Sequence, residues 1–354
     1  MSVLDNMERI KTLDVTNMLG SVEALPDQIR QTVEDGESFE INLVSEVKNV
    51  IVAGMGGSAL GADVIKNLYA DALPCSFEIV KDYNLPAYAD RSTLLIVVSY
   101  SGNTEETVSA AKQGLDKGCQ IAFMTAGGEL EKMATENNAP LFKIVAKNNP
   151  CNQPRMALGY MITALAIMLT KAGLLSLTAG DYESAILACM EVDKRCGVGI
   201  KTEENPAKML ALEIVDRRPV LMAAEFLEGP LHASTNQLNE NAKTFASYNI
   251  IPELNHHLME GLIFPKSLSS TTFFLLFQSK LYHARNQERT ELVAKLFENK
   301  KFDHTVVELT TDSRLTQVFE LLTMMSYTSI YLAILEEIDP SPVPIVDWFK
   351  NELA

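Results

Sequence analysis

The sequence predicts an α/β protein built from two doubly wound parallel sheets, each flanked by helices. The first observation is an alternation of short apolar runs, glycine-containing turns and helical patterns, which occupies residues 38–173 and returns more loosely over 206–354. The second is a pair of loops of small residues, 54–59 and 99–104, each placed directly after a run typical of a buried strand. Ligands of such sheets bind at the carboxyl ends of the strands, so both loops are candidates for a ligand site.

Length and composition allow more than one domain. The chain has 354 residues, of which 47% are hydrophobic, which is enough to bury two cores of ordinary domain size. We expect an N-terminal helical segment, a first α/β domain, a weakly apolar helical connection, and a second α/β domain with a C-terminal helix, at 1–37, 38–173, 174–205 and 206–354.

The charge and the cysteines limit the classes of partner. A net charge of −16 disfavours nucleic acid and anionic membranes, so a phosphorylated substrate needs a local cluster of donors and cations. Five cysteines without a Cys-x-x-Cys pair favour reduced thiols and a cytoplasmic protein. The beginning of the chain, 1–11, lacks the apolar run of a signal peptide. The apolar stretch 156–170 is shorter than the roughly 20 residues that span a bilayer, which predicts a core helix.

The elements of the first half follow from these patterns. Apolar residues at helical spacing run through 1–37 up to Gly36, and we expect this segment to be helical and peripheral. Strands are predicted at 49–53, 77–80, 94–98, 120–124 and 141–145, and helices at 58–69, 104–117, 130–137 and 156–170.

The second half repeats the alternation with less regularity. Strands are predicted at 219–223, 272–277 and 305–309, with a short turn at 249–251, and helices at 206–216, 231–246, 290–300, 314–337 and 345–353. This half has no serine-rich loop of its own, so we expect one site for each pair of domains.

The loop 99–104 has the composition of an anion site. Ser99, Ser101 and Thr104 place three hydroxyls around Gly102, and the helix that follows adds free N–H groups and a partial positive charge. A phosphate monoester fits such a loop without any lysine or arginine. The simpler alternative is a Ser/Thr helix cap after a core strand.

The loop 54–59 allows two interpretations. Its G-x-G-x-x-A pattern, with Asp82 after the next strand, is also typical of dinucleotide binding. A dinucleotide site does not need the second phosphate loop at 99–104. In the other interpretation, Gly56 and Gly57 let the backbone approach a sugar closely, and Ser58 hydrogen-bonds it.

Four motifs together resemble one family. The run 99–107 resembles the phosphate loop of sugar-isomerase (SIS) domains, and 54–58 resembles the first loop of that domain. With 238–243 and 252–257, the chain resembles, over roughly 40–354, the bifunctional phosphoglucose/phosphomannose isomerases, which are two SIS domains in tandem. The resemblance implies a metal- and cofactor-independent isomerase acting on hexose 6-phosphates.

The same resemblance implies roles for four further residues. Glu240 would be the base that moves a proton between C1 and C2, and Arg155 would stabilise the cis-enediolate. His256 and Lys350 would assist ring opening, with His256 reaching the site of a neighbouring subunit, so that a homodimer with shared sites is implied. Each residue also has a simpler interpretation: a surface cap charge for Arg155, an exposed carboxylate for Glu240, a loop or metal histidine for His256 and a solvated terminal charge for Lys350.

Two other functions stay open. A sugar-phosphate sensor of the SIS type would bind the same ligands without turnover, although this acidic chain has no basic helix-turn-helix. A nucleotide-dependent dehydrogenase would use the loop 54–59. One departure from the resembled family is that the segment 231–235 lacks the basic residues expected before Asn239.

Overall fold

The first sheet contains five parallel strands. The computed structural model describes residues 2–353, and in it the strands run in the order β2-β1-β3-β4-β5. Their bounds are β1 Asn49–Gly54, β2 Ser76–Val80, β3 Thr93–Ser99, β4 Gln120–Thr125 and β5 Leu141–Lys143. The strand order reverses between β1 and β3, where Gly54 lies opposite Val98. Both predicted loops therefore leave the sheet side by side at this switch point.

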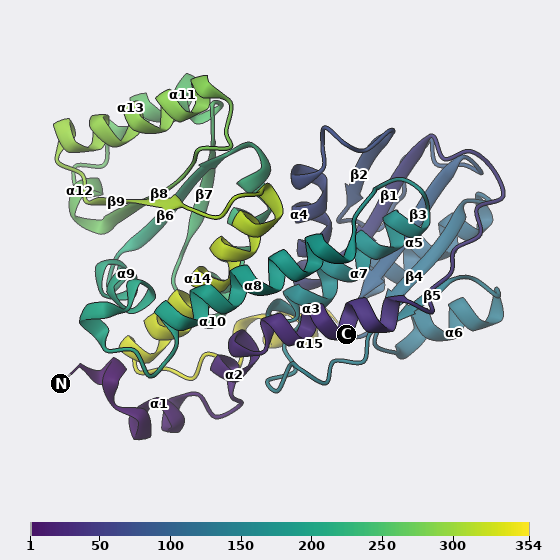
Figure 1. The fold of residues 1–354 in the computed structure, drawn as a ribbon, viewed down its shortest axis with the longest axis horizontal. Helices are drawn as coiled ribbons and strands as arrows, with labels where there is room; N and C mark the ends of the chain where they lie inside the picture. Colours follow the sequence, from purple (N-terminus) through teal and green to yellow (C-terminus); the bar gives the residue numbers. More distant parts are fainter. Residues whose placement is uncertain (1, 354) are drawn as a thin grey trace.

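Helices cover both faces of this sheet, as Figure 1 shows. They are η2 Gly56–Ser58, α4 Leu60–Leu68, α5 Glu105–Asp116, α6 Gly128–Glu136, η3 Pro154–Met156 and α7 Leu158–Lys171. Every strand and helix predicted for this domain is present, and the buried α7 confirms the core helix expected at 156–170.

The N-terminal segment is helical as predicted, but its placement at the periphery was wrong. It forms η1 Val3–Asp5, α1 Met7–Leu13, α2 Met18–Glu23 and α3 Leu25–Gly36. Helix α3 packs against α7 and the later helix α8, Ala179–Cys196. Gln28 is fully buried in α3 because its amide bonds the backbone at the start of α7, donating to the Met156 carbonyl at 2.9 Å and accepting from Gly159 N at 3.1 Å.

The second sheet has four parallel strands in the order β7-β6-β8-β9. Their bounds are β6 Arg218–Ala224, β7 Ser247–Ile251, β8 Thr272–Ser279 and β9 His304–Leu309. The predictions of a helix up to residue 246 and a turn at 249–251 were wrong. The helix α10, Glu228–Asn241, ends early because Lys243 takes a left-handed conformation with φ +53°, and the chain then pairs with β6 as the edge strand β7.

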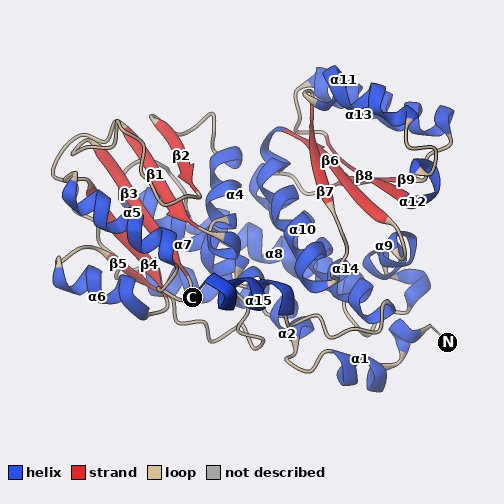
Figure 2. Ribbon diagram, turned by 180° about the vertical axis from the view of Figure 1, so that it is seen from behind, coloured by secondary structure: helices blue, strands red, loops and turns tan. Residues whose placement is uncertain are grey.

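The remaining helices surround the second sheet and join the domains (Figure 2). They are α8, η4 Thr202–Glu204, α9 Pro206–Ile214, η5 Glu225–Leu227, α10, α11 Leu254–His257, η6 Leu258–Ile263, α12 Leu268–Thr271, α13 Ala284–Lys300, α14 Arg314–Leu335 and α15 Pro344–Leu353. The elements α11, η6 and α12 were not predicted, and α13 begins earlier than the expected residue 290.

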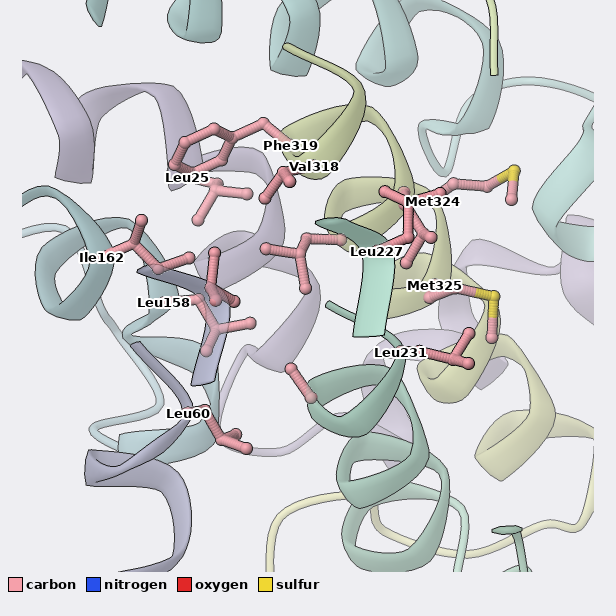
Figure 3. Packing of buried hydrophobic residues seen from close by; sticks show 14 of the residues in the cluster. Leu25, Leu60, Leu158, Ile162, Leu227, Leu231, Val318, Phe319, Met324 and Met325 are labelled. Atoms are coloured by element: carbon pink, nitrogen blue, oxygen red, sulfur yellow. The ribbon is translucent and has the colours of Figure 1, made fainter. Parts of the chain in front are cut away.

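The two domains share one hydrophobic core. Figure 3 shows side chains of α3, α4 and α7 facing those of α10 and α14, among them Leu158, Leu231 and Phe319. By length and composition α14 is the one helix in the described residues that is apolar enough to cross a membrane. However, 94% of its most apolar window is buried inside the structure. A helix that is apolar on all sides and enclosed in this way is a core helix.

Helix α10 lies directly against α4 at a position where a side chain does not fit. A Cβ added to Gly229 would lie 2.4 Å from the Asp63 carbonyl oxygen and 2.6 Å from the Val64 Cα. We expect Gly229→Ala to lower the free energy of unfolding by about 1–3 kcal/mol, because the helices must move apart. Urea denaturation measures this change. In the matched control Gly199→Ala, the added Cβ meets no atom within 4 Å, so an equal loss in both variants would contradict the prediction.

Candidate active site

The loop after β3 is held in one shape by its neighbour. Gly102 has φ +73°, and a Cβ there would lie 1.7 Å from the Gly127 carbonyl oxygen, so only glycine fits. The Gly102 carbonyl in turn accepts from Leu130 N at 3.0 Å, and the Tyr100 carbonyl accepts from Ala126 N at 3.1 Å. Residues 126–130, which follow β4, thus hold the loop 99–104 in place through backbone contacts.

The three predicted hydroxyls lie on this loop. Ser99 is buried, its Oγ lies 2.8 Å from Thr104 Oγ1, and it accepts from Gly102 N at 3.1 Å. Ser101 is exposed and Thr104 half-buried. Thr104 is the N-cap of α5 but makes no side-chain capping bond. The first N–H groups of α5 and two accessible hydroxyls therefore lie together on this loop, an arrangement that can bind an anion.

The loop after β1 lies beside it and reaches Arg155. Ser58 Oγ accepts from Tyr100 N at 2.9 Å, which joins the two loops. A Cβ added to Gly57 would lie 2.9 Å from the backbone nitrogen of Arg155, so the close approach that Gly57 allows is to η3. Gly56 has φ +49° and no atom within 4 Å of an added Cβ, which leaves open space above it. Ser58 thus has a structural bond in addition to its predicted contact with sugar.

Arg155 is a buried cation and not a surface cap. Its side chain is 2% exposed, although it stands in the short helix η3 at the domain boundary. Its guanidinium donates to Asn241 Oδ1 at 2.6 Å, Gln153 Oε1 at 2.9 Å, Glu240 Oε2 at 3.3 Å, Pro340 O at 3.0 Å and Ser341 O at 2.7 Å. Apart from the neighbouring Gln153, these partners come from two distant parts of the chain, 240–241 and 340–341, so the arginine fixes the domains relative to one another at this point.

Glu240 is the only acid bonded to this arginine among the described residues. Its side chain is 31% exposed, so one side remains open to a ligand. Burial raises the pKa of Glu240 above its usual value, and the positive charges of Arg155, Lys350 and Lys243 oppose that rise. Lys350, on the exposed helix α15, is therefore close enough to act on Glu240 electrostatically. A carboxylate with a raised pKa that stays ionisable suits a general base.

The structure does not bring His256 to the other predicted residues. It is exposed on α11, which follows β7 at the carboxyl edge of the second sheet. Glu240 is twelve positions after the first residue of α10, Glu228, which starts from the same edge, so the helix carries it about 18 Å away. Figure 1 likewise shows α11 at the top of the second domain and α15 far below it.

Two parts of the site had no clear signal in the sequence. Arg155 is bound by the backbone carbonyls of Pro340 and Ser341. Every residue has such a carbonyl, so the residue types at these positions do not predict the contact. Lys243 is the last residue of the motif 238–243, and its charge acts on Glu240. Its position three residues after Glu240 is the only sign of this in the sequence.

Comparisons with known proteins first define the class. The model of the SIS domain matches residues 43–165, and that of the bacterial phospho-glucose isomerase C-terminal SIS domain matches 203–353. The fold is also that of a hypothetical protein from Thermus thermophilus, with a TM-score of 0.74 over 98% of this chain and 93% of that one, at 17% identity. The protein is thus an α/β protein of two SIS domains, and the predicted fold class is confirmed.

Its relatives give the particular family. The chain is 32% identical to the bifunctional phosphoglucose/phosphomannose isomerase of Caldicellulosiruptor bescii, over 95% of this chain and 99% of that protein. It is 29% identical to the one from Thermoplasma volcanium, over 91% and 97% of the two chains. This chain belongs to the family of bifunctional phosphoglucose/phosphomannose isomerases, and the resemblance read from its motifs is confirmed.

The electrostatic link between Lys350 and Glu240 can be tested directly. In Lys350→Met we expect the pKa of Glu240 to rise further, because a positive charge that favours the carboxylate is removed. Carbon-13 NMR of labelled glutamate over a pH series measures it, with the signal assigned by its loss in Glu240→Gln. Lys132→Met, on α6, is the control. An unchanged titration in Lys350→Met would place this lysine outside the site.

Proposed function

We propose that the protein interconverts glucose 6-phosphate and mannose 6-phosphate with fructose 6-phosphate through a cis-enediolate. The observation that carries this proposal is the ion pair of the buried Arg155 with the partly exposed Glu240, beside a loop of hydroxyls and free N–H groups. The relatives' names supply the substrate class. Aldose-ketose exchange moves one hydrogen from C2 to C1 and one from O2 to O1 within the same molecule, so its atoms and electrons balance without a cofactor or an oxidant.

In this proposal the loop of β3 binds the phosphate. Ser101 and Thr104 donate hydroxyl hydrogens to its oxygens, and the N-terminus of α5 stabilises its charge. Ser99 orients Thr104 through their 2.8 Å contact. The open space above Gly56 and the neighbouring Gly57 and Ser58 take the sugar, whose far end then extends towards Arg155.

Glu240 and Arg155 carry out the proton transfer. Glu240 removes the C2 proton of the open-chain aldose, and the electron pair moves to form the C1–C2 double bond while charge builds on O1. Arg155 is already desolvated and fixed by its five partners, so it stabilises the enediolate without reorganising. Glu240 then returns the proton to C1, while the hydroxyl proton of O2 passes to O1, so that C2 becomes the carbonyl carbon and C1 carries the hydroxyl. The intermediate has lost the C2 stereocentre, so both epimers can share it.

Ring opening is assigned to Lys350 and His256. Lys350 lies near Glu240, whereas His256 is too distant within one chain. We therefore propose a two-fold homodimer in which His256 of each chain completes the site of the other. We also propose that the enzyme works in the cytoplasm, which the five free cysteines among the described residues support. Nucleic acid and membranes are not among its proposed partners.

Replacement of the base tests the function. We expect Glu240→Gln to lower kcat by at least about 10²-fold with little change in the Kd for fructose 6-phosphate, because shape and hydrogen bonding remain. A coupled assay for glucose 6-phosphate and a parallel assay for mannose 6-phosphate measure turnover, and calorimetry measures binding.

The phosphate loop supplies the contrasting variant. In Ser101→Ala with Thr104→Ala, the Kd should increase strongly, since each lost bond to the charged phosphate costs about 1.5–3 kcal/mol. Binding without turnover in the unmodified protein would instead identify a non-catalytic sugar-phosphate sensor. Turnover that is normal in Glu240→Gln would move the base elsewhere.

Mixed dimers test the shared site. Glu240→Gln and His256→Ala homodimers should each be impaired at both sites. A mixed dimer carries one doubly damaged and one intact site, so random subunit exchange should restore about a quarter of full activity. Native mass spectrometry confirms the exchange. If confirmed mixed dimers gain no activity, the site is built within one chain.

A further inference from the structure

Lys243 ends α10 in a conformation that its residue type disfavours. Its φ of +53° lies in the left-handed region, where glycine or asparagine usually follows a helix and other residues cost about 1–2 kcal/mol. Ala242 N and Thr244 N both donate to the Leu238 carbonyl, so backbone bonds already close the end of the helix. The lysine side chain is not needed for that closure. Its contacts are therefore the place to look for a reason why a lysine occupies this position.

The ammonium of Lys243 bonds backbone carbonyls only. It donates to Asn241 O at 3.2 Å, Asp339 O at 3.1 Å and Pro340 O at 3.0 Å. These bonds use all three of its donors. One anchor is the end of its own helix, and the other two belong to the turn 339–341 between α14 and α15. The lysine therefore ties this turn to the end of α10.

The same turn holds Arg155. The Pro340 carbonyl accepts from Lys243 Nζ and from Arg155 Nη2, each at 3.0 Å, and the Ser341 carbonyl accepts from Arg155 at 2.7 Å. Ser341 N closes the turn by donating to Asp339 Oδ1 at 2.9 Å. Two cations meet on one carbonyl, an arrangement that costs electrostatic energy. The position of Arg155 thus depends on a turn that Lys243 secures.

Lys350 depends on the turn as well. Helix α15 begins at Pro344, shortly after the turn, and none of its described residues is buried. The start of α15 is therefore held mainly by its covalent connection to the turn 339–341. A displaced turn would shift Arg155 directly and Lys350 through this connection, while Glu240 would lose a nearby positive charge.

We propose that Lys243 is a positioning residue of the active site, which holds the turn 339–341 against α10 so that Arg155, Glu240 and Lys350 keep their mutual arrangement. This inference rests on the proposed function. Lys243 does not itself contact the reacting atoms in this assignment. Small displacements of catalytic groups cost about 10²-fold in rate, so a residue of this kind affects kcat more than KM.

Ionisation of Lys243 gives the proposal a specific pH signature. Burial, followed by repulsion from Arg155, lowers the pKa of Lys243 to about 8, while Asp339 and Glu240 raise it. Lys243 lies in the wall of a depression on the protein surface. Four other charged residues line this depression: Asp216, Arg217, Arg218 and Glu336. Above a pH of about 8 the ammonium loses a proton and a donor to the turn. The kcat of the unmodified enzyme should therefore decline as pH rises through this value.

Three variants test the assignment. We expect Lys243→Met to lower kcat for fructose 6-phosphate by about 10- to 100-fold with a smaller change in KM, and to move the acidic limb of the kcat/KM profile to higher pH. Lys243→Arg keeps donors and a charge that does not titrate, so it should recover part of the activity and lose the decline near pH 8. Lys301→Met is the matched control, because Lys301 is also left-handed, with φ +59°, at the end of α13.

The outcomes separate the two proposals. If the unmodified enzyme has no isomerase activity, the proposed function fails. If it is active and Lys243→Met matches Lys301→Met in kcat and pH profile, the positioning role is wrong. Circular dichroism checks folding, and Lys243→Asn, which tolerates a left-handed backbone, replaces Lys243→Met if the latter does not fold.

Discussion

The buried guanidinium of Arg155 is the constraint on which the rest of the site depends. A cation that is 2% exposed must have partners for all its donors, and here they come from η3, the end of α10 and the turn before α15. Satisfying one side chain thus requires both domains to be in place. The only carboxylate among its partners in the described residues is Glu240, so the same requirement sets Glu240 beside the cation.

The domain boundary is arranged to bring these groups together. Helix α4 starts directly after the loop 54–59, and α10 runs past α4 in the opposite direction, as the pairs Asp63–His232 and Asn67–Glu228 show. Gly229 permits the two helices to touch backbone to backbone. This antiparallel contact delivers the end of α10, with Glu240, to the switch point of the first sheet. The second domain has no serine-rich loop like 99–104 in its described residues, but it supplies the helix that carries Glu240.

The sequence predicted local features well and long-range contacts poorly. The strands of the first sheet were predicted because their central residues are apolar runs. The loop 99–104 was singled out because three hydroxyls and Gly102 stand within six residues. Strand β7 was missed because an edge strand with half-exposed residues has little apolar pattern. The end of α10 was misplaced because the left-handed residue that follows it is Lys243, whereas glycine or asparagine is the usual sequence signal for such a helix end. The bond between Arg155 and Glu240 could not be predicted from local pattern, because the two residues are 85 positions apart. Arg155 is also held by backbone carbonyls, which have no signal in the sequence.

The burial of α14 has a consequence for how the chain is made. This helix, near the end of the sequence, contacts η1 and α2 at the beginning of it as well as α8, α9 and α10. Buried Lys208 also binds Asp5 across more than half of the chain. During synthesis η1 and α2 therefore lack this packing partner until almost the whole protein has left the ribosome. Their apolar side chains stay exposed to aggregation for most of translation.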